Sequence, residues 1–361
     1  MVKNQTIMKE NTNGDNPMGS HGLYPNPQEL IRQDEINFEI LKKLAGKSIV
    51  SVDQFEKEMV LEICKFAAFL EVTDIASHHP LDGKIIITAF FEASTRTRLS
   101  FESAVLRLDG KIISIPMGKT TGAAKGESLS DMGEMFNAYG DLIVMRHTNT
   151  SSVEEIMENL RLPLINAGNG SGEHPTQALA DWFAILKWKP RLKENIVKEK
   201  DQINLGILGT PGSMRAVNSF LRMSLLFKTG IRKILIVSEM ADPLGPELTE
   251  LLKSSNIPFQ MTNDINEILS DLDVIYMNSI TFLGDSYKSL DSRFKLNAQS
   301  NLKEDAVVLH PLARLDELDP DLDETNHNLY FTQAHGAVFI RQAVLISLLN
   351  RLDRLPKHVA K

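Results

Sequence analysis

The chain has 361 residues and a formal net charge of -8, with 42% hydrophobic and 24% charged residues, a composition typical of a globular protein with about two domains. The negative charge without a basic tract disfavours nucleic-acid binding, and no apolar run reaches the roughly 18 residues of a membrane span. A single cysteine, Cys64, excludes an internal disulfide, disfavours a cysteine-based metal site and is typical of a reducing, cytoplasmic setting.

The first half of the chain alternates predicted helices and strands. Residues 1–28 are rich in Asn, Gly and Pro and lack the apolar core of a secretory signal, so we expect a flexible extension there. Apolar residues at spacings of three and four then predict two amphipathic helices in 29–44 and 52–72. Strands are expected at 83–91, 111–116, 141–147 and 162–168, with helices at 101–108, 128–139 and 151–160 between them. Short apolar strands alternating with helices predict a parallel sheet covered on both faces.

The second half repeats this alternation. A long helix is expected at 175–188, and the polar, charge-rich stretch after it indicates a domain boundary. Strands follow at 203–208, 233–238, 271–278 and 305–311, helices at 213–227 and 246–255, and a closing helix at 337–352. We predict an α/β fold of two doubly wound parallel-sheet domains joined by interdomain helices. The domains are expected at 29–185 plus 337–356 and at 186–336, after the extension of residues 1–28.

A cluster of hydroxyl and guanidinium side chains follows the strand expected at 83–91. Ser94, Thr95, Arg96 and Thr97 lie at the start of the next helix, where free backbone N–H groups and the positive helix end attract an anion. The guanidinium of Arg96 can bind two phosphate oxygens at once. Because helix capping needs only one or two such residues, the cluster favours a phosphate site.

Two nucleotide-binding motifs fit less well. The segment "GKTTG" (118–122) lacks the glycine that a P-loop needs five residues before Gly118, where Ile113 stands. The segment "GILGTPGSM" (206–214) follows a strand and opens a helix, but its glycines are spaced G-x-x-G-x-x-G, and Glu239 comes later than the usual acidic residue. An NAD-dependent dehydrogenase therefore remains only a remote alternative.

Further polar residues end other predicted strands, where open α/β sheets bind their ligands. They are Arg146 and His147, then His174, Thr176 and Gln177, and finally His310 and Arg314. No carboxylate pair or His/Cys cluster has metal-ligand spacing, and Ser94 lies outside a G-x-S-x-G elbow. Metal-assisted and covalent chemistry are both disfavoured.

Five segments resemble one enzyme family. "FFEASTRTRLSFE" (90–102), "KGESLSD" (125–131), "VMRH" (144–147), "NAGNGSGEHPTQAL" (166–179) and "LHPLARLDE" (309–317) are similar, in this order, to the catalytic chain of aspartate carbamoyltransferase. The resemblance runs from about Leu44 to Leu352. It implies transfer of the carbamoyl group of carbamoyl phosphate to an amine, with release of phosphate and without metal or cofactor. It also implies a homotrimer whose active sites are shared between subunits.

The resemblance assigns roles by position in this chain. Residues 29–185 plus 337–356 would bind carbamoyl phosphate, and 186–336 the acceptor. His174 would polarise the carbonyl oxygen, Arg146 would bridge that oxygen and the phosphate, and Gln177 would face the carbamoyl NH2. The implied carbamoyl phosphate site comprises Ser94, Thr95, Arg96, Thr97, Arg146, His174, Gln177, Thr121, Lys125, Pro311 and Leu312. Of these, Arg96, Arg146, His174 and Lys125 would be catalytic, and Lys125 would come from a neighbouring subunit. Thr121 stands where the family usually has serine.

The acceptor side departs from the family pattern. Arg215 matches the arginine that binds the acceptor's α-carboxylate, which implies an amino acid or related amine. In "NSITFLGDS" (278–286), however, Ser279, Thr281 and Gly284 replace the Arg, Gln and Arg of aspartate enzymes. The ornithine signature H-C-L-P is also absent, since Pro311 occupies the cysteine position, and Ala313 replaces the usual second proline.

The sequence leaves several alternatives open. The acceptor can be aspartate or a smaller or less acidic amine bound near Ser279 and Thr281, and a link to pyrimidine biosynthesis depends on which it is. A catalytically inactive paralogue that still binds carbamoyl phosphate is the main alternative to an enzyme. The segment 278–290 is a candidate lid, with a solvated loop as the alternative, and the sequence does not indicate whether a regulatory subunit binds.

Overall fold

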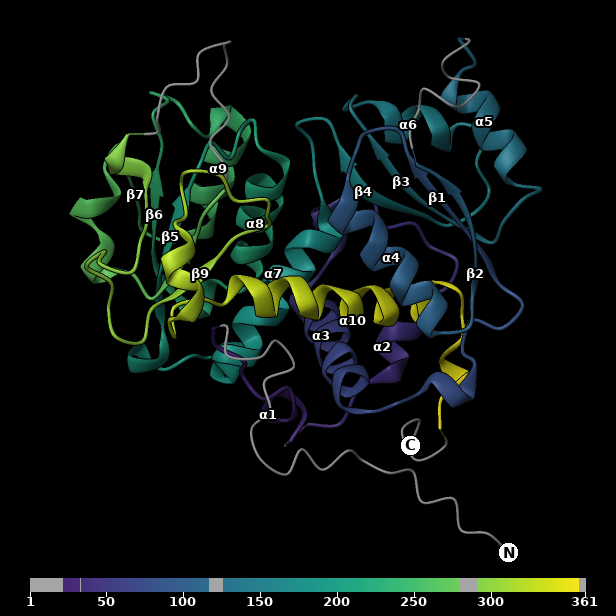
Figure 1. Ribbon diagram of the computed structural model, residues 1–361, viewed down its shortest axis with the longest axis horizontal. Helices are drawn as coiled ribbons and strands as arrows, with labels where there is room; N and C mark the ends of the chain where they lie inside the picture. Colours follow the sequence, from purple (N-terminus) through teal and green to yellow (C-terminus); the bar gives the residue numbers. More distant parts are fainter. Residues whose placement is uncertain (1–21, 33, 117–125, 279–290, 357–361) are drawn as a thin grey trace, which may run out of the picture.

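The computed structural model describes residues 22–32, 34–116, 126–278 and 291–356. The strands are β1 (Ile85–Phe90), β2 (Lys111–Ile115), β3 (Leu142–His147), β4 (Leu164–Asn169), β5 (Ile203–Leu208), β6 (Ile231–Val237), β7 (Phe259–Thr262), β8 (Val274–Tyr276) and β9 (Val307–Leu309). Within the described chain they form two parallel sheets, with the orders β2-β1-β3-β4 and β7-β6-β5-β8-β9. Figure 1 shows the two sheets as the centres of two halves that lie side by side.

Helices connect and cover these strands. They are α1 (Gln28–Ile31), α2 (Phe38–Lys42), α3 (Lys57–Val72), α4 (Thr95–Arg107), α5 (Leu129–Phe136), α6 (Ser152–Met157), α7 (Pro175–Trp188), α8 (Arg215–Leu226), α9 (Gly245–Ser255) and α10 (Tyr330–Leu348). The predicted bounds of β5 and α7 coincide with those observed. The alternation and the two parallel sheets confirm the predicted α/β fold class.

Burial explains why the strands read as continuous apolar runs. Every residue of β4 and β5 is buried, because helices cover both faces of each sheet. The edge strand β2 is different: Lys111, Ile113 and Ser114 are exposed. The short strand β7, also at an edge, was not expected from the sequence, since Gln260 and Met261 are exposed and leave it without an apolar run.

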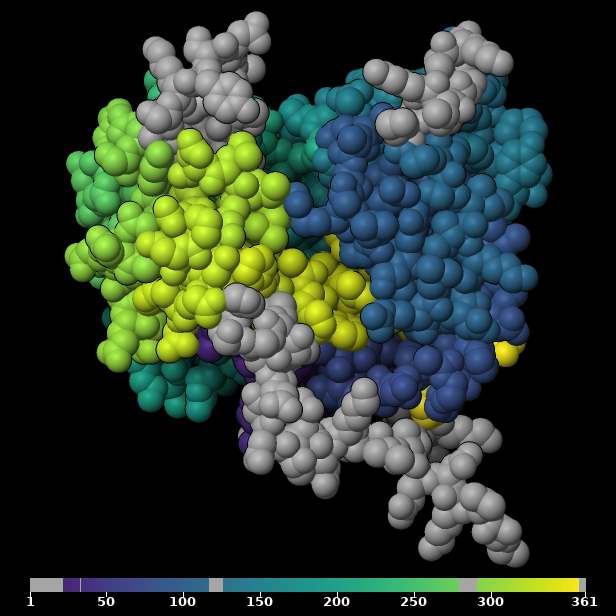
Figure 2. Space-filling model, in the orientation of Figure 1, coloured from purple at the N-terminus to yellow at the C-terminus, as the bar shows by residue number. Residues whose placement is uncertain are grey.

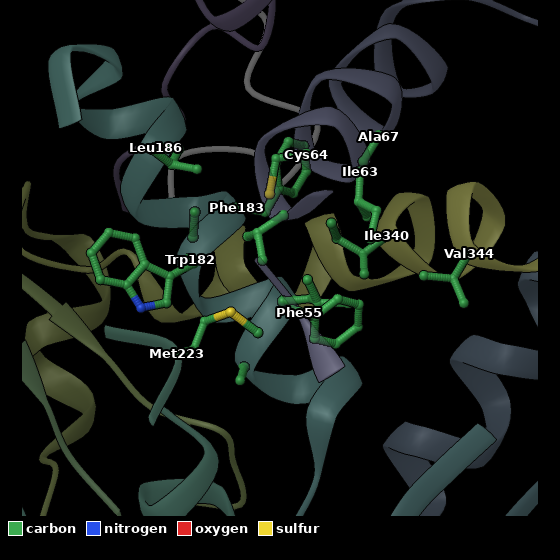
Figure 3. Packing of buried hydrophobic residues seen from close by; sticks show 14 of the residues in the cluster. Phe55, Ile63, Cys64, Ala67, Trp182, Phe183, Leu186, Met223, Ile340 and Val344 are labelled. Carbon is green, nitrogen blue, oxygen red and sulfur yellow. The ribbon is translucent and has the colours of Figure 1, made fainter. Parts of the chain in front are cut away.

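Two helices join the halves, as predicted. Helix α7 packs against α8 and β4, and α10 packs against α7, α3 and α4. In Figure 1, the yellow helix α10 runs across the view from one half to the other. Figure 3 shows the shared core between these helices, where Trp182 and Phe183 of α7, Met223 of α8 and Ile340 of α10 belong to one cluster of buried side chains. Burying a large apolar side chain contributes about 1.5–3 kcal/mol, so this core fixes the two halves relative to each other.

The N-terminal region differs from the prediction in two ways. The helix expected at 29–44 is divided into α1 and α2, because the backbone N–H of Asn37 donates to Glu62 at 2.8 Å and the Asn37 side chain caps α2 by accepting from Glu39 N. Residues 22–28 also belong to the folded part rather than to a flexible extension. The backbone N–H of Leu23 donates to Asn328 O at 2.9 Å, and Leu23 O accepts from the Thr332 hydroxyl at 2.6 Å.

Helix α10 begins seven residues earlier than the predicted closing helix. Its first turns carry Thr332, Gln333 and Gly336, which interrupt the apolar periodicity. Thr332 and Gln333 are nevertheless buried, because each has hydrogen-bond partners inside the protein. None of the described helices combines the length and apolar character needed to cross a lipid bilayer.

A buried ion pair lies where α3, α7 and the N-terminal segment meet. Lys187 and Glu71 are 0% and 1% exposed, and Lys187 Nζ donates to both Glu71 oxygens at 3.0 and 2.9 Å. The Tyr24 hydroxyl donates to Glu71 Oε1 at 2.6 Å. Burial alone would raise the pKa of Glu71, but the Lys187 charge and these hydrogen bonds hold it below its usual value. The Glu71 carboxylate is therefore charged, and the protein can bury this charge only because Lys187 and Tyr24 compensate it.

We predict that Lys187→Met lowers the unfolding free energy by about 3–5 kcal/mol, because it leaves the Glu71 carboxylate buried without its cation. The double variant Lys187→Met/Glu71→Leu should recover most of this loss, since it buries no unpaired charge. Urea denaturation of both variants measures the difference. Equal losses in the single and double variants would show that the ion pair is not the cause.

Candidate active site

A cavity of about 860 Å³ lies where the carboxyl ends of the two sheets face each other. Its walls come from the loop after β1 with the start of α4, the ends of β3 and β4, the turn after β5, the segment after β9, and α10. Figure 2 shows the junction between the two halves, along which the cavity opens. Among the residues that sequence analysis singled out, those lining the cavity are Ser94, Thr95, Arg96, Thr97, Arg146, His174, Gln177, Arg215, His310, Pro311 and Leu312.

Other predicted residues lie away from the cavity or outside the described residues. Thr121, Lys125, Ser279, Thr281 and Gly284 lie outside the described residues, as does the expected lid apart from Asn278. Three of the candidate residues that the structure describes do not line the cavity. His147 packs its ring against Phe91, Thr176 is fully buried in α7, and Arg314 forms an ion pair with Asp323.

The start of α4 presents its polar groups to the cavity. Ser94 is the N-cap residue by backbone position, but its side chain makes no capping hydrogen bond. Helix capping therefore does not account for the Ser94 hydroxyl. Arg96 lies in the first turn of α4, and burial lowers the pKa of its guanidinium. Free backbone N–H groups, hydroxyls and a guanidinium at one helix start form an arrangement suited to a phosphate.

One carboxylate joins two arginines from different halves of the molecule. Glu92 Oε1 accepts from Arg146 Nη2 at 2.7 Å, and Arg215 donates to Glu92 Oε2 at 2.9 Å and to Oε1 at 2.5 Å. Arg215 Nη1 also donates to Gly170 O at 2.8 Å. Burial alone would raise the pKa of Glu92, but Arg215 and Arg146 hold it below its usual value. Glu92 was not expected from the sequence, although it lies within the quoted segment 90–102.

The two histidines of the cavity have different surroundings. His174 is 4% exposed, and neither ring nitrogen has a hydrogen-bond partner among the described residues. Burial, reinforced by the charges of Arg146, Arg341 and Arg215, holds the pKa of His174 well below 6.5. Its imidazole is therefore neutral at pH 7 and can donate one hydrogen bond into the cavity. His310 is instead engaged in the protein, because its Nδ1 accepts from Leu312 N at 2.8 Å and its Nε2 lies 2.9 Å from Glu317 Oε1.

Helix α10 adds two residues to the cavity wall that sequence analysis missed. Arg341 is 3% exposed, donates to the Ser100 hydroxyl, and lies 4.7 Å from the centre of the Phe101 ring. Burial lowers the pKa of Arg341 to about 9. Gln333 also lines the cavity and is 1% exposed. Arg341 lies in the helical pattern of the predicted closing helix, and Gln333 lies before the start of that predicted helix, so neither was expected at the cavity.

The turn after β5 does not provide a dinucleotide-binding loop. Met214 folds back into the turn, where its sulfur accepts from Thr210 N at 3.3 Å and from Asn278 Nδ2 at 3.2 Å. A Cβ at Gly209 would lie 3.1 Å from that sulfur. The Met214 side chain thus occupies the space next to the backbone that a pyrophosphate would approach, which disfavours the dehydrogenase alternative.

Comparison with known proteins identifies relatives over most of the chain. The model of the carbamoyl-P binding domain of aspartate/ornithine carbamoyltransferase matches residues 47–187, and that of the Asp/Orn binding domain matches 201–348. The chain is 35% identical over 318 residues to the aspartate carbamoyltransferase catalytic subunit of Methanobrevibacter smithii, covering 86% of this chain and 97% of the relative. It is 33% identical over 319 residues to the chloroplastic aspartate carbamoyltransferase of Arabidopsis thaliana, covering 86% and 79%.

Solved structures with the same fold include complexes. The aspartate transcarbamoylase of Trypanosoma cruzi with carbamoyl aspartate and phosphate matches with a TM-score of 0.74 at 28% identity, covering 86% of this chain and 98% of that one. The same enzyme with carbamoyl phosphate matches with a TM-score of 0.74 at 29% identity, covering 88% and 99%.

The neutral state of His174 predicts a pH dependence of stability. Between its low pKa in the folded protein and its ordinary value of about 6.5, the unfolded chain binds a proton at His174 that the folded chain does not. Stability should therefore fall as the pH is lowered through 6.5. In His174→Asn this slope should be smaller by up to about 1.4 kcal/mol per pH unit, as measured by urea denaturation between pH 5.5 and 7.5. An unchanged slope would mean that His174 has the same pKa in the folded and the unfolded chain.

Proposed function

Because the chain belongs to the aspartate/ornithine carbamoyltransferase family, we propose that it transfers the carbamoyl group of carbamoyl phosphate to an amino acid or related amine. The observation that carries this proposal is one cavity in which Arg96, Arg146 and the unpartnered ring of His174 meet. A protein without a ligand at this place would leave a buried imidazole without hydrogen bonds, which is unfavourable. The inactive paralogue remains the second candidate and is separated by the assay below.

We assign the donor to the half built on the first sheet. Residues 29–185 plus 337–356 would bind carbamoyl phosphate, with its phosphate at Ser94, Thr95, Arg96 and Thr97 and its NH2 near Gln177. Pro311 and Leu312 of the other half would complete the site beside the NH2 group. Arg146 and His174 would face the carbonyl oxygen, where negative charge grows as the amine attacks. Donors that are already oriented before the reaction stabilise the transition state far better than solvent does. Thr121 and Lys125 are assigned to the same site from the resemblance alone.

The proposed reaction needs no group beyond the two substrates. The lone pair of a neutral amine forms a bond to the carbonyl carbon, and the bond from that carbon to the phosphate oxygen breaks. Phosphate leaves with the bonding electrons and can take the proton that the amine loses. The site's contribution is to hold both substrates in contact and to stabilise charge on the carbonyl oxygen.

The acceptor would bind in the half formed by residues 186–336. Arg215 lines the cavity and is the candidate for an acceptor carboxylate. The two arginines of the aspartate pattern are replaced by Ser279 and Gly284, so a second carboxylate would lack the cations that these arginines supply. We propose an acceptor with one carboxylate, positioned by Arg215 and by Ser279 and Thr281, rather than aspartate.

We further propose a homotrimer in the cytoplasm. A trimer would let a neighbouring subunit supply Lys125 to each cavity, as the resemblance implies. The relatives include proteins named catalytic subunits and one enzyme named chloroplastic.

Release of phosphate from carbamoyl phosphate with a panel of amines tests the proposal. We predict that an amino compound with a single carboxylate exceeds aspartate by at least about a hundredfold in kcat/KM, because a buried carboxylate without its cation costs roughly 3 kcal/mol or more. Arg146→Ala should abolish release with every acceptor and serves as the control. If aspartate is the best acceptor, the acceptor proposal is wrong. If carbamoyl phosphate raises the melting temperature but no amine supports release, the chain is an inactive paralogue.

A further inference from the structure

A chain of hydrogen bonds leads from a backbone N–H of the second half to the cavity. It begins at His310, whose backbone N–H donates to Gln333 Oε1 at 2.9 Å. Gln333 Nε2 donates to Asp181 Oδ1 at 2.6 Å, and Gln177 Nε2 donates to the same oxygen at 2.7 Å. Gln177 and Asp181 are four residues apart on α7, so they share one face of that helix.

The donor and acceptor of each hydrogen bond in this series follow from the first donor, the backbone N–H of His310. A backbone N–H can only donate, so the Gln333 amide must turn its oxygen to His310 and its nitrogen to Asp181. Asp181 Oδ1 must then accept, and the second amide that meets it, that of Gln177, must also present its nitrogen. The carbonyl oxygen Oε1 of Gln177 is left for the cavity, and no described residue donates a hydrogen bond to it.

The protonation state of Asp181 does not alter this result. Asp181 is fully buried, and burial raises its pKa to about 7. Its other oxygen, Oδ2, has no hydrogen-bond partner among the described residues. Because two amide N–H groups already point at Oδ1, a proton on Asp181 would reside on Oδ2, and Oδ1 would still accept from both amides.

We propose that Asp181 is a positioning residue that fixes the Gln177 amide with Oε1 toward the cavity, so that the site selects a carbonyl donor carrying an NH2 group. If the amide oxygen of Gln177 faces the cavity, it can accept a hydrogen bond from a carbamoyl NH2. If the amide nitrogen faced the cavity instead, two donor groups would meet and no hydrogen bond could form. This inference rests on the proposed function, which makes carbamoyl phosphate the donor. It adds the residue that lets the site distinguish carbamoyl phosphate from an acyl phosphate of the same shape.

Two stable phosphonates isolate the contribution of the NH2 group. Phosphonoacetamide and acetonylphosphonate have the same shape and differ in having NH2 or CH3 on the carbonyl carbon. We expect the full chain to bind the amide about tenfold more tightly than the ketone, which is the effect of one hydrogen bond. Calorimetric titration gives both dissociation constants. Their ratio within one protein preparation is insensitive to the fraction that is folded.

Asp181→Ala should reduce this preference to about twofold or less. Asp181→Asn, which keeps an acceptor oxygen and the shape of the side chain, should retain most of it. Tyr276→Phe is the matched control, because it removes a hydroxyl that interacts with Asp181 and leaves the amide chain intact. In a Gln177→Ala background, which already lacks the preference, Asp181→Ala should change nothing further.

Each contrary result has a distinct meaning. A full preference in Asp181→Ala, or equal losses in Asp181→Ala and Asp181→Asn, overturns the positioning role while carbamoyl phosphate binding stands. A wild-type chain that binds both phosphonates equally also overturns it. A wild-type chain that binds neither phosphonate overturns the proposed function, and the inference with it.

Discussion

The shared carboxylate of Glu92 is the interaction on which the candidate site depends. Arg146 ends a strand of the first sheet and Arg215 begins a helix of the second half, and both are held by this one side chain. Two guanidinium groups so close in a partly buried cavity repel each other, and burial together with Arg215 already lowers the pKa of Arg146. A carboxylate between them removes that repulsion. It thereby permits several arginines to line one cavity at the junction of the two halves, as the proposed phosphate-bearing donor and carboxylate-bearing acceptor would require.

The two halves contribute to the cavity through different kinds of segment. Ser94 and Arg96 lie at a helix start directly after a buried strand, and His174 lies at the start of α7, whose core packing fixes it in place. These elements are rigid, so they suit the developing charge of a transition state. The proposed acceptor residues include Arg215, which follows the turn after β5, and Ser279 and Thr281, which lie outside the described residues. The sequence departs from the aspartate pattern at 278–286, whereas the residues at the start of α4 keep the family pattern.

The sequence predicted the layers of the fold because buried parallel strands are continuous apolar runs. It also predicted most of the cavity's polar residues, since each stands at the end of a strand or the start of a helix. It failed where polar side chains are buried through partners distant in the chain. Gln333 and Thr332 concealed the start of α10, and the pairing of Gln177 and Gln333 on Asp181 joins residues 152 positions apart. Glu92 was missed for the same reason, because its role appears only when Arg215, 123 positions away, is beside it.

The central claim is that the cavity between the halves holds the carbamoyl donor, with its phosphate at the start of α4. A crystal structure of the chain with carbamoyl phosphate tests this most directly. The account predicts phosphate oxygens within hydrogen-bond distance of Ser94, Arg96 and Thr97, and the carbonyl oxygen facing His174 and Arg146. Phosphate bound instead at the turn after β5, beside Ser213, would contradict it.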